Sequence, residues 1–180
     1  MRETIEKLSI AKRSIIGIIQ IFTLGIIIFK SSKQIKNALI SEHLLSFYVK
    51  VRKQTRHLAA PLSEADQCVQ SMPDASPTKW HLAHTTWFFE TFILKRFVRD
   101  YQEFHPNYNF LFNSYYEQIG ERHVRSERGM ITRPSSNEVY EYRDHVDKAM
   151  KDYFEMKPTS DVLQLIELGI NHEQQHQSRS

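Results

Sequence analysis

The chain has 180 residues, and its 41% hydrophobic and 25% charged residues are ordinary for one globular domain, with or without an appendage. The formal net charge is only +3 and is partly concentrated in the first forty residues. We expect no nucleic-acid partner, because proteins of that class carry a dense basic stripe. Cys68 is the only cysteine, which excludes an intrachain disulfide and favours a cytoplasmic location over an oxidising compartment.

An apolar run, IIGIIQIFTLGIIIF, occupies residues 15–29. It is shorter than the roughly twenty apolar residues that a membrane-spanning helix needs, and no cleavage site typical of a signal peptide follows it. Three interpretations stay open: a weak membrane anchor, a helix packed on the domain, and an extension foreign to the fold. Because the composition changes near Ala38, we predict an N-terminal extension over residues 1–40 and one domain over residues 41–180.

Two helical segments are predicted at the start of this domain. Ser41 is the expected N-cap of the first helix, and Pro61 is expected to end it. Ser63 and Asp66 indicate a further short helical turn. The expected apolar face of the first helix consists of Leu44, Leu45, Tyr48, Val49 and Leu58.

The next predicted helix begins at Ser76 and Pro77, because serine is a favourable N-cap and proline is tolerated at the first helical position. We expect this helix to run from Pro77 to about Val98. Its predicted buried face contains Trp80, Trp87, Phe88, Leu94 and Val98.

The second half of the domain alternates loops and helices. Residues 104–120 are predicted to form a packed loop with a short helix before Gly120, and residues 121–134 a basic loop. Ser135 and Glu138 have the spacing of a capping box, which predicts a helix that continues to Phe154. The predicted buried stripe of that helix is Val139, Tyr142, Val146, Met150 and Tyr153.

A last helix is predicted from about Ser160 to the chain end. The sequence contains no strand-like alternation of polar and apolar residues. It therefore predicts an all-α fold, an antiparallel four-helix bundle with an extra N-terminal apolar helix.

Three histidines lie on the predicted apolar faces. His172 and His176 are spaced i, i+4 on the last helix, where they continue a stripe from Leu165 and either Gly169 or Leu168, and two imidazoles at this spacing can share one ion. His84 lies on the buried face of the second long helix, whereas His81 is somewhat off that face. Because buried imidazoles need partners, we predict that His84, His172 and His176 form one metal site, suited to Zn(II) or non-haem Fe(II).

The sequence from His172 to His176 also matches the H-E-x-x-H motif of zinc peptidases, in which Glu173 would be the general base. Those enzymes usually take their third metal ligand from a residue downstream of the motif. Only four residues follow His176 here, so the peptidase interpretation is disfavoured.

Several separated strings occur in one order: SMPDASPTKWHLAHTTWFFE at residues 71–90, FHP at 104–106, NSYY at 113–116, ERGMITRP at 127–134 and NHEQQH at 171–176. Together they resemble the sulfoxide synthases of ergothioneine biosynthesis, also called hercynine oxygenases, over about residues 41–177. The resemblance implies a DinB-like four-helix bundle. It also implies that His84, His172 and His176 are iron ligands.

The same resemblance implies an O2-dependent reaction. In it a low-molecular-weight thiol, γ-glutamylcysteine or cysteine, is coupled to trimethylhistidine (hercynine) and a sulfoxide is formed. Members of the family continue into a sulfatase-modifying-factor-like domain that supplies the catalytic tyrosine. We expect that domain to be absent from this chain, which would make the chain a fragment that is weakly active or inactive alone, with no catalytic residue assigned.

Two arginines, Arg125 and Arg128, are candidate ligands for substrate carboxylates. Two other hypotheses stay open. The first is a stand-alone DinB-like metalloprotein, for example a thiol-dependent transferase. The second is a non-enzymatic bundle that binds a partner, or a membrane through residues 15–29.

Overall fold

The computed structural model describes residue 32 and residues 34–114 and 120–178. Residues 40–180 group into one compact unit, which contains all the side chains discussed below. Among the described residues the secondary structure is entirely helical, so the predicted all-α class is confirmed. The apolar run at residues 15–29 lies outside the described residues, and within the described part of the chain no helix is long and apolar enough to cross a membrane.

The first described helix covers residues 34–59. Ser41 lies inside it, so the prediction that Ser41 is its N-cap was wrong, although Pro61 does follow its end. The face assignment was partly wrong as well, because Val49 and Leu58 are exposed. The buried apolar side chains of this helix are Leu44, Tyr48, Val51 and Ala59.

One short helix precedes the second long helix. Helix α2, Glu64–Cys68, begins at the predicted capping box of Ser63 and Asp66. Helix α3, Thr78–Phe89, has Pro77 as its N-cap, one residue later than predicted. The hydroxyl of Ser76 caps nothing, because it accepts a hydrogen bond from Arg128 instead.

Helix α3 continues without a break into a π-helical segment, η1, Glu90–Leu94, and then into α4, Lys95–Phe97. The sequence predicted one helix to about Val98 but not the wider π-helical turn. The carboxylate of Glu90 is buried in this turn, where it accepts hydrogen bonds from the hydroxyls of Tyr142 (2.5 Å) and Tyr101 (2.9 Å). Burial and the nearby carboxylate of Glu90 raise the pKa of both tyrosines, so the two hydroxyls remain protonated donors that satisfy the buried carboxylate.

The connection after α4 contains the expected short helix before Gly120, α5, Tyr108–Phe112. A 3-10 helix, η3, Arg125–Met130, occupies the middle of the predicted basic loop. The side chain of Gln70 fixes η3 beside the segment before α3. Its amide donates to the carbonyls of Ala75 (2.7 Å) and Arg125 (3.0 Å), and its carbonyl accepts from the N–H of Gly129 (2.6 Å).

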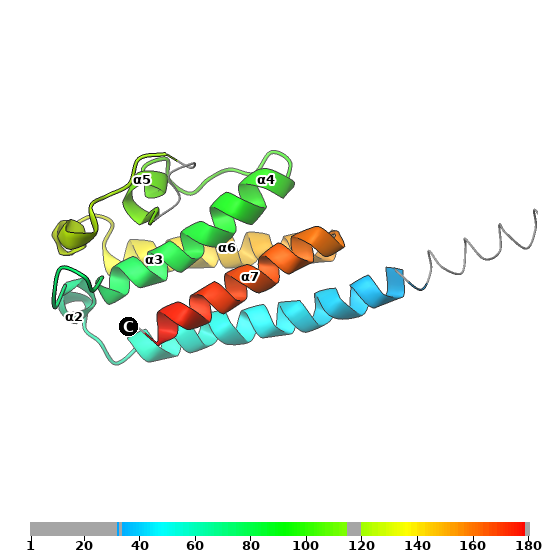
Figure 1. Cartoon of the computed structure of the whole chain (residues 1–180), viewed down its shortest axis with the longest axis horizontal. Helices are drawn as coiled ribbons and strands as arrows, with labels where there is room; N and C mark the ends of the chain where they lie inside the picture. Colours follow the sequence, from blue (N-terminus) through cyan, green and yellow to red (C-terminus); the bar gives the residue numbers. More distant parts are fainter. Residues whose placement is uncertain (1–31, 33, 115–119, 179–180) are drawn as a thin grey trace, which may run out of the picture. The chain divides into compact units, whose positions relative to one another are not determined.

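Helix α6, Ser136–Glu155, starts at the predicted capping box of Ser135 and Glu138. Helix α7, Ser160–Gln177, follows after a four-residue connection and is therefore antiparallel to α6. Figure 1 shows the long helices lying lengthwise beside one another, and α3 contacts both α6 and α7. All five residues of the predicted α6 stripe are buried: Val139, Tyr142, Val146, Met150 and Tyr153.

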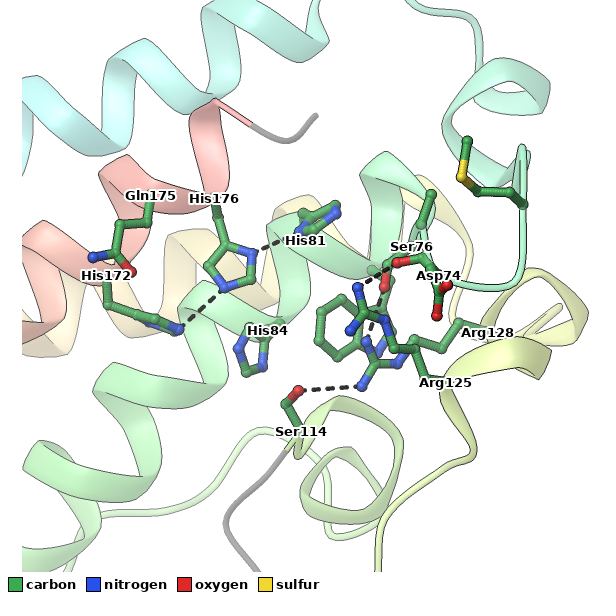
Figure 2. Close-up of a pocket in the computed structure, with 13 residues that line it drawn as sticks. Asp74, Ser76, His81, His84, Ser114, Arg125, Arg128, His172, Gln175 and His176 are labelled. Carbon is green, nitrogen blue, oxygen red and sulfur yellow. Dashed lines mark hydrogen bonds between the residues drawn. The ribbon is translucent and has the colours of Figure 1, made fainter.

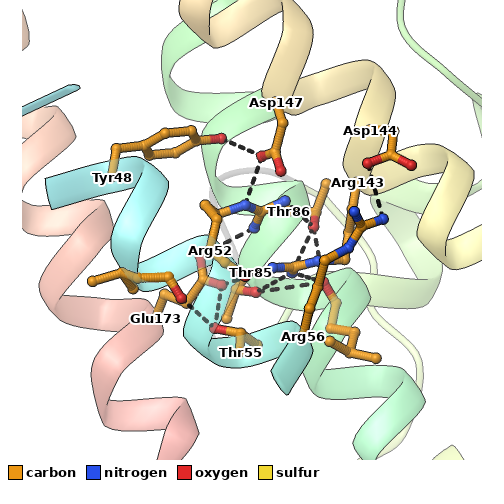
Figure 3. A network of polar contacts seen from close by, with 12 residues as sticks. Tyr48, Arg52, Thr55, Arg56, Thr85, Thr86, Arg143, Asp144, Asp147 and Glu173 are labelled. Atoms are coloured by element: carbon orange, nitrogen blue, oxygen red, sulfur yellow. Dashed lines mark hydrogen bonds and ion pairs between the residues drawn. The ribbon is translucent and has the colours of Figure 1, made fainter. Parts of the chain in front are cut away.

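A buried polar network ties the first helix, α3, α6 and α7 together (Figure 3). The carboxylate of Glu173 accepts hydrogen bonds from Arg52 (3.0 Å), Arg143 (2.9 Å) and the Thr55 hydroxyl (2.6 Å). Arg52 also donates to Asp147 at 2.6 Å. Charges can be buried here because each is paired and hydrogen-bonded to its neighbours.

Candidate metal centre

Three histidines from two helices meet at one end of the bundle. His84 is buried on α3, whereas His172 and His176 are half-buried on the last turns of α7. Each offers one ring nitrogen, and these three nitrogens lie within 4.8 Å of one another. Figure 2 shows the three rings facing the same space.

The imidazole of His84 is fixed by its surroundings. Its Nδ1 lies 2.6 Å from the carbonyl oxygen of Phe112, and because a carbonyl only accepts, Nδ1 must carry the proton. The ring is stacked between the indoles of Trp80, at 4.4 Å between centroids, and Trp87, at 5.6 Å. Burial, with the neighbouring His176 and His172, holds the pKa of His84 well below its ordinary value. His84 is therefore neutral at pH 7, and the lone pair of its Nε2 is available to a metal ion.

The two histidines of α7 approach each other through their outer nitrogens. Nε2 of His172 lies 3.1 Å from Nε2 of His176. Burial lowers the pKa of His172, which favours the neutral form that binds metals. Two nitrogens that are each about 2.1 Å from one ion and at right angles to each other are about 3.0 Å apart. The observed 3.1 Å is close to this value, so both nitrogens could bind one ion, and the donor set fits a divalent transition metal.

A fourth histidine, His81, belongs to this cluster and was not assigned to it from the sequence. Its Nδ1 lies 2.7 Å from Nδ1 of His176. The sequence placed His81 off the buried face of α3, but only 7% of the residue is exposed. The missed signal was its position three residues before His84, which puts both side chains on the same side of α3.

The predicted apolar stripe of α7 was only partly right, because Gly169 is buried and Leu165 is half-buried against the core. Leu168 is exposed, and the most deeply buried side chains of α7 are Ile166, Ile170 and Glu173. The two histidines therefore lie beside the core rather than within it. That position leaves them in contact with a pocket while Gly169 packs against α3.

Glu173 does not join the histidines. Its carboxylate is held by Arg52 and Arg143 in the buried network, and it does not line the pocket that the histidines share. Burial by itself would raise the pKa of Glu173, but the two guanidinium groups and the hydrogen bonds lower it to about 2. A carboxylate with so low a pKa, whose oxygens are held by two guanidinium groups, is a poor proton acceptor, and the geometry therefore gives no support to the zinc-peptidase interpretation.

The histidines line a pocket of about 530 Å³. Arg128 forms part of its wall: this residue is only 4% exposed, and its guanidinium lies 3.5 Å from the centroid of the Trp80 ring. Its two terminal nitrogens donate to the hydroxyls of Ser76 (2.9 Å) and Ser114 (3.3 Å). Arg125 also lines the pocket, but it is exposed and donates to the backbone carbonyl of Asp74.

Comparison with known proteins places the chain in a family. No curated protein matches the chain. Residues 48–178, which include α3, α6, α7 and all four clustered histidines, match the DinB superfamily. Since this match extends over most of the chain and the fold is an all-helical bundle, the protein belongs to the DinB superfamily.

Proposed function

We propose that the protein binds one Fe(II) ion through His84, His172 and His176. The observation that carries the proposal is the convergence of three ring nitrogens within 4.8 Å at the wall of a pocket. Fe(II) held by three neutral imidazoles would keep its full positive charge and would supply redox chemistry, with coordination positions left for an anionic thiolate. Zn(II) is the alternative ion, since it accepts the same nitrogens.

The chain's own residues prepare this site in two ways. Burial keeps His84 neutral, so its Nε2 atom does not have to lose a proton before it binds an ion. The Phe112 carbonyl and the two flanking indoles fix the orientation of its ring. Such outer partners commonly strengthen metal binding because they pre-orient the ligand.

We further propose that the site serves the reaction of a hercynine oxygenase. In that reaction trimethylhistidine, a thiol and O2 give the sulfoxide and one water. One C–S and one S–O bond form, the S–H and imidazole C–H bonds are broken, and O2 takes up four electrons. Support comes from the pocket itself. Residues from four of the separated strings that resemble this family line it together, namely Ser76, His84, Ser114, Arg128 and His172.

Within this proposal, Arg128 binds a carboxylate of the substrate. Its guanidinium is held in place by the Trp80 ring and by the hydroxyls of Ser76 and Ser114, so little side-chain freedom is lost on binding. Arg125 is a weaker candidate, because it is exposed and water screens its charge.

The substrate proposal is tested with the anaerobic, Fe(II)-loaded chain. Calorimetric titration with γ-glutamylcysteine and with cysteine should show thiol binding that requires the metal and is weakened roughly tenfold in Arg128→Gln, the loss expected for one charged hydrogen-bonded contact. His123→Gln, in a histidine that does not line the metal pocket, is the matched control. Trimethylhistidine and O2 are then added and the product is identified by mass spectrometry.

A sulfoxide that forms in the parent chain, or thiol binding that depends on iron, supports the proposal. Iron binding without either result would support the metal site and overturn the substrate assignment. A strong preference for Zn(II), together with transfer of another group to the thiol, would favour a thiol-dependent transferase.

A further inference from the structure

His81 is the member of the histidine cluster that the proposed ligand set does not use. It lies on the first turns of α3, and its backbone N–H donates to the carbonyl of Pro77 at 3.1 Å. Its ring packs edge-on against the Trp80 indole, with the centroids 5.6 Å apart. The ring is thus held by a rigid helix and a buried neighbour, and it presents Nδ1 to Nδ1 of His176 at 2.7 Å.

We propose that His81 is a positioning residue that accepts a hydrogen bond from Nδ1 of His176 and thereby directs Nε2 of His176 toward the metal. This inference rests on the proposed function, because His176 must be a ligand for the orientation to matter. It assigns His81 no contact with the ion.

The distance alone allows either histidine to be the donor, and the proposed metal role of His176 selects His176. A distance of 2.7 Å between two ring nitrogens requires one proton between them, and Nδ1 of His81 and Nδ1 of His176 are such a pair. A neutral His176 has one proton, so a proton on Nδ1 leaves Nε2 as a bare lone pair. That Nε2 faces His172, in the direction of the other proposed ligands. In the opposite tautomer His176 would carry a hydrogen where the lone pair is needed.

His176 also needs such support more than the other two ligands. It lies one residue before the end of α7, where helices fray, whereas His84 is in the interior of α3. Nδ1 of His172 is buried without a hydrogen-bond partner among the described residues, so no outer partner is seen at that nitrogen in the described part of the chain. The ring of His176 contacts α3 through His81, with 2.7 Å between the two Nδ1 atoms.

The first test measures metal affinity of the full chain with Fe(II) and, as a spectroscopic probe, Co(II). His81→Phe keeps the ring volume and removes the acceptor. His81→Asn keeps an acceptor oxygen near the former Nδ1 position. His57→Phe, at an exposed position of the first helix, controls for the introduced phenyl ring. The unfolding midpoint of each variant shows that it is folded.

We expect His81→Phe to bind both ions roughly 10- to 100-fold more weakly, the loss typical of an outer-shell partner. His81→Asn should restore most of the affinity and the parental Co(II) visible spectrum, and His57→Phe should match the parent. Equal affinity in His81→Phe and the parent overturns the inference. Equal weakening in the Phe and Asn variants also overturns it, because packing alone would then explain the effect.

A second measurement, made on the metal-free chain, tests whether His81 sets the tautomer of His176. Nitrogen-15 NMR of the metal-free chain reports which nitrogen of His176 carries the proton. We expect protonated Nδ1 in the parent and in His81→Asn, and a shift toward protonated Nε2 in His81→Phe. An unchanged His176 tautomer in His81→Phe contradicts the positioning role. A parent chain that binds no ion contradicts the proposed function instead, so the two failures are distinguishable.

Discussion

His172 and Glu173 are adjacent in sequence but serve different sides of α7. Successive helical residues point about 100° apart, so one side chain reaches the pocket and the other the buried network. The imidazole of His172 faces the other histidines, whereas the carboxylate of Glu173 is held between two guanidinium groups (Figures 2 and 3). The network therefore lies next to the candidate site, on a different side of α7.

Replacing Glu173 by glutamine should destabilise the protein strongly. The change leaves the buried cations of Arg52 and Arg143 without their shared carboxylate, and breaking a buried ion pair typically costs about 3–5 kcal/mol. Urea unfolding of the metal-free chain at pH 7 measures the free energy of unfolding. Glu167→Gln, at an exposed position of the same helix, is the control and should change it by less than about 0.5 kcal/mol.

The lowered pKa of the Glu173 carboxylate predicts how the stability of the protein depends on pH. Its folded-state pKa of about 2 is below the ordinary value of 4.5, so its contribution to stability is fully present above pH 4.5 and is lost as the pH falls toward 2. Unfolding measured across that range should show a smaller pH slope in Glu173→Gln than in the parent. Identical slopes would show that Glu173 is not held as an ion.

For individual residues, the sequence predicted which histidines belong to the candidate site better than it predicted the contacts that orient them. The i, i+4 histidines and the Trp-flanked His84 are visible as local patterns, and the structure brings their nitrogens together. The Phe112 carbonyl that orients His84 could not be predicted, because any residue presents a carbonyl. The contact between His81 and His176 depends on how α3 and α7 face each other, which spacing within one helix does not determine.

Between elements, the approach of α7 to α3 is set by Gly169. A Cβ at this position would lie 2.7 Å from a ring carbon of Phe89 and 2.8 Å from one of Phe88, and both rings are buried. The absence of a side chain therefore allows the close packing that places His172, one turn further along, opposite His84.

Substituting Gly169 with alanine should therefore separate the two helices. Alanine gains up to about 1 kcal/mol of helix propensity, but overpacking a filled core typically costs about 1–3 kcal/mol. Because two buried rings must move, we expect a net loss of roughly 1–2 kcal/mol in the free energy of unfolding, together with weaker metal binding. Gln164→Ala, at an exposed position of α7, should change neither quantity appreciably. A more stable Gly169→Ala variant with unaltered affinity would contradict this packing argument.

Element boundaries were predictable where they depend on local chemistry. The capping boxes at Ser63 and Ser135 formed as predicted, since each joins residues three positions apart. Ser41 failed as a cap because residues before it are already helical, and Ser76 failed because its hydroxyl bonds Arg128, 52 residues away. At the π-helical turn, the carboxylate of Glu90 bonds partners from two other segments, which no local pattern of α3 shows.

For the molecule as a whole, the bundle explains why the candidate site lies where it does. Four long helices among the described residues share a core that is apolar around α3 and α6 and polar where the first helix meets α7. The histidines lie at the end of the bundle where η3 and the segment before α3 form the wall of the pocket. The fold class followed from helical periodicity, whereas the pocket depends on loop contacts such as those of Gln70.

The measurement that tests the central claim most directly is an anaerobic Fe(II) titration of the intact chain. It is performed beside His84→Ala, His172→Ala, His176→Ala and, as a control, His105→Ala at an exposed position outside the pocket. Circular dichroism and the unfolding midpoint verify that each variant is folded.

We predict that the parent and His105→Ala bind one iron per chain. Each of the three other variants should bind it more than roughly 100-fold more weakly, beyond the loss typical of an outer-shell partner. A parent chain that binds no iron, or ligand variants that bind iron as tightly as the parent, would contradict the three-histidine metal centre.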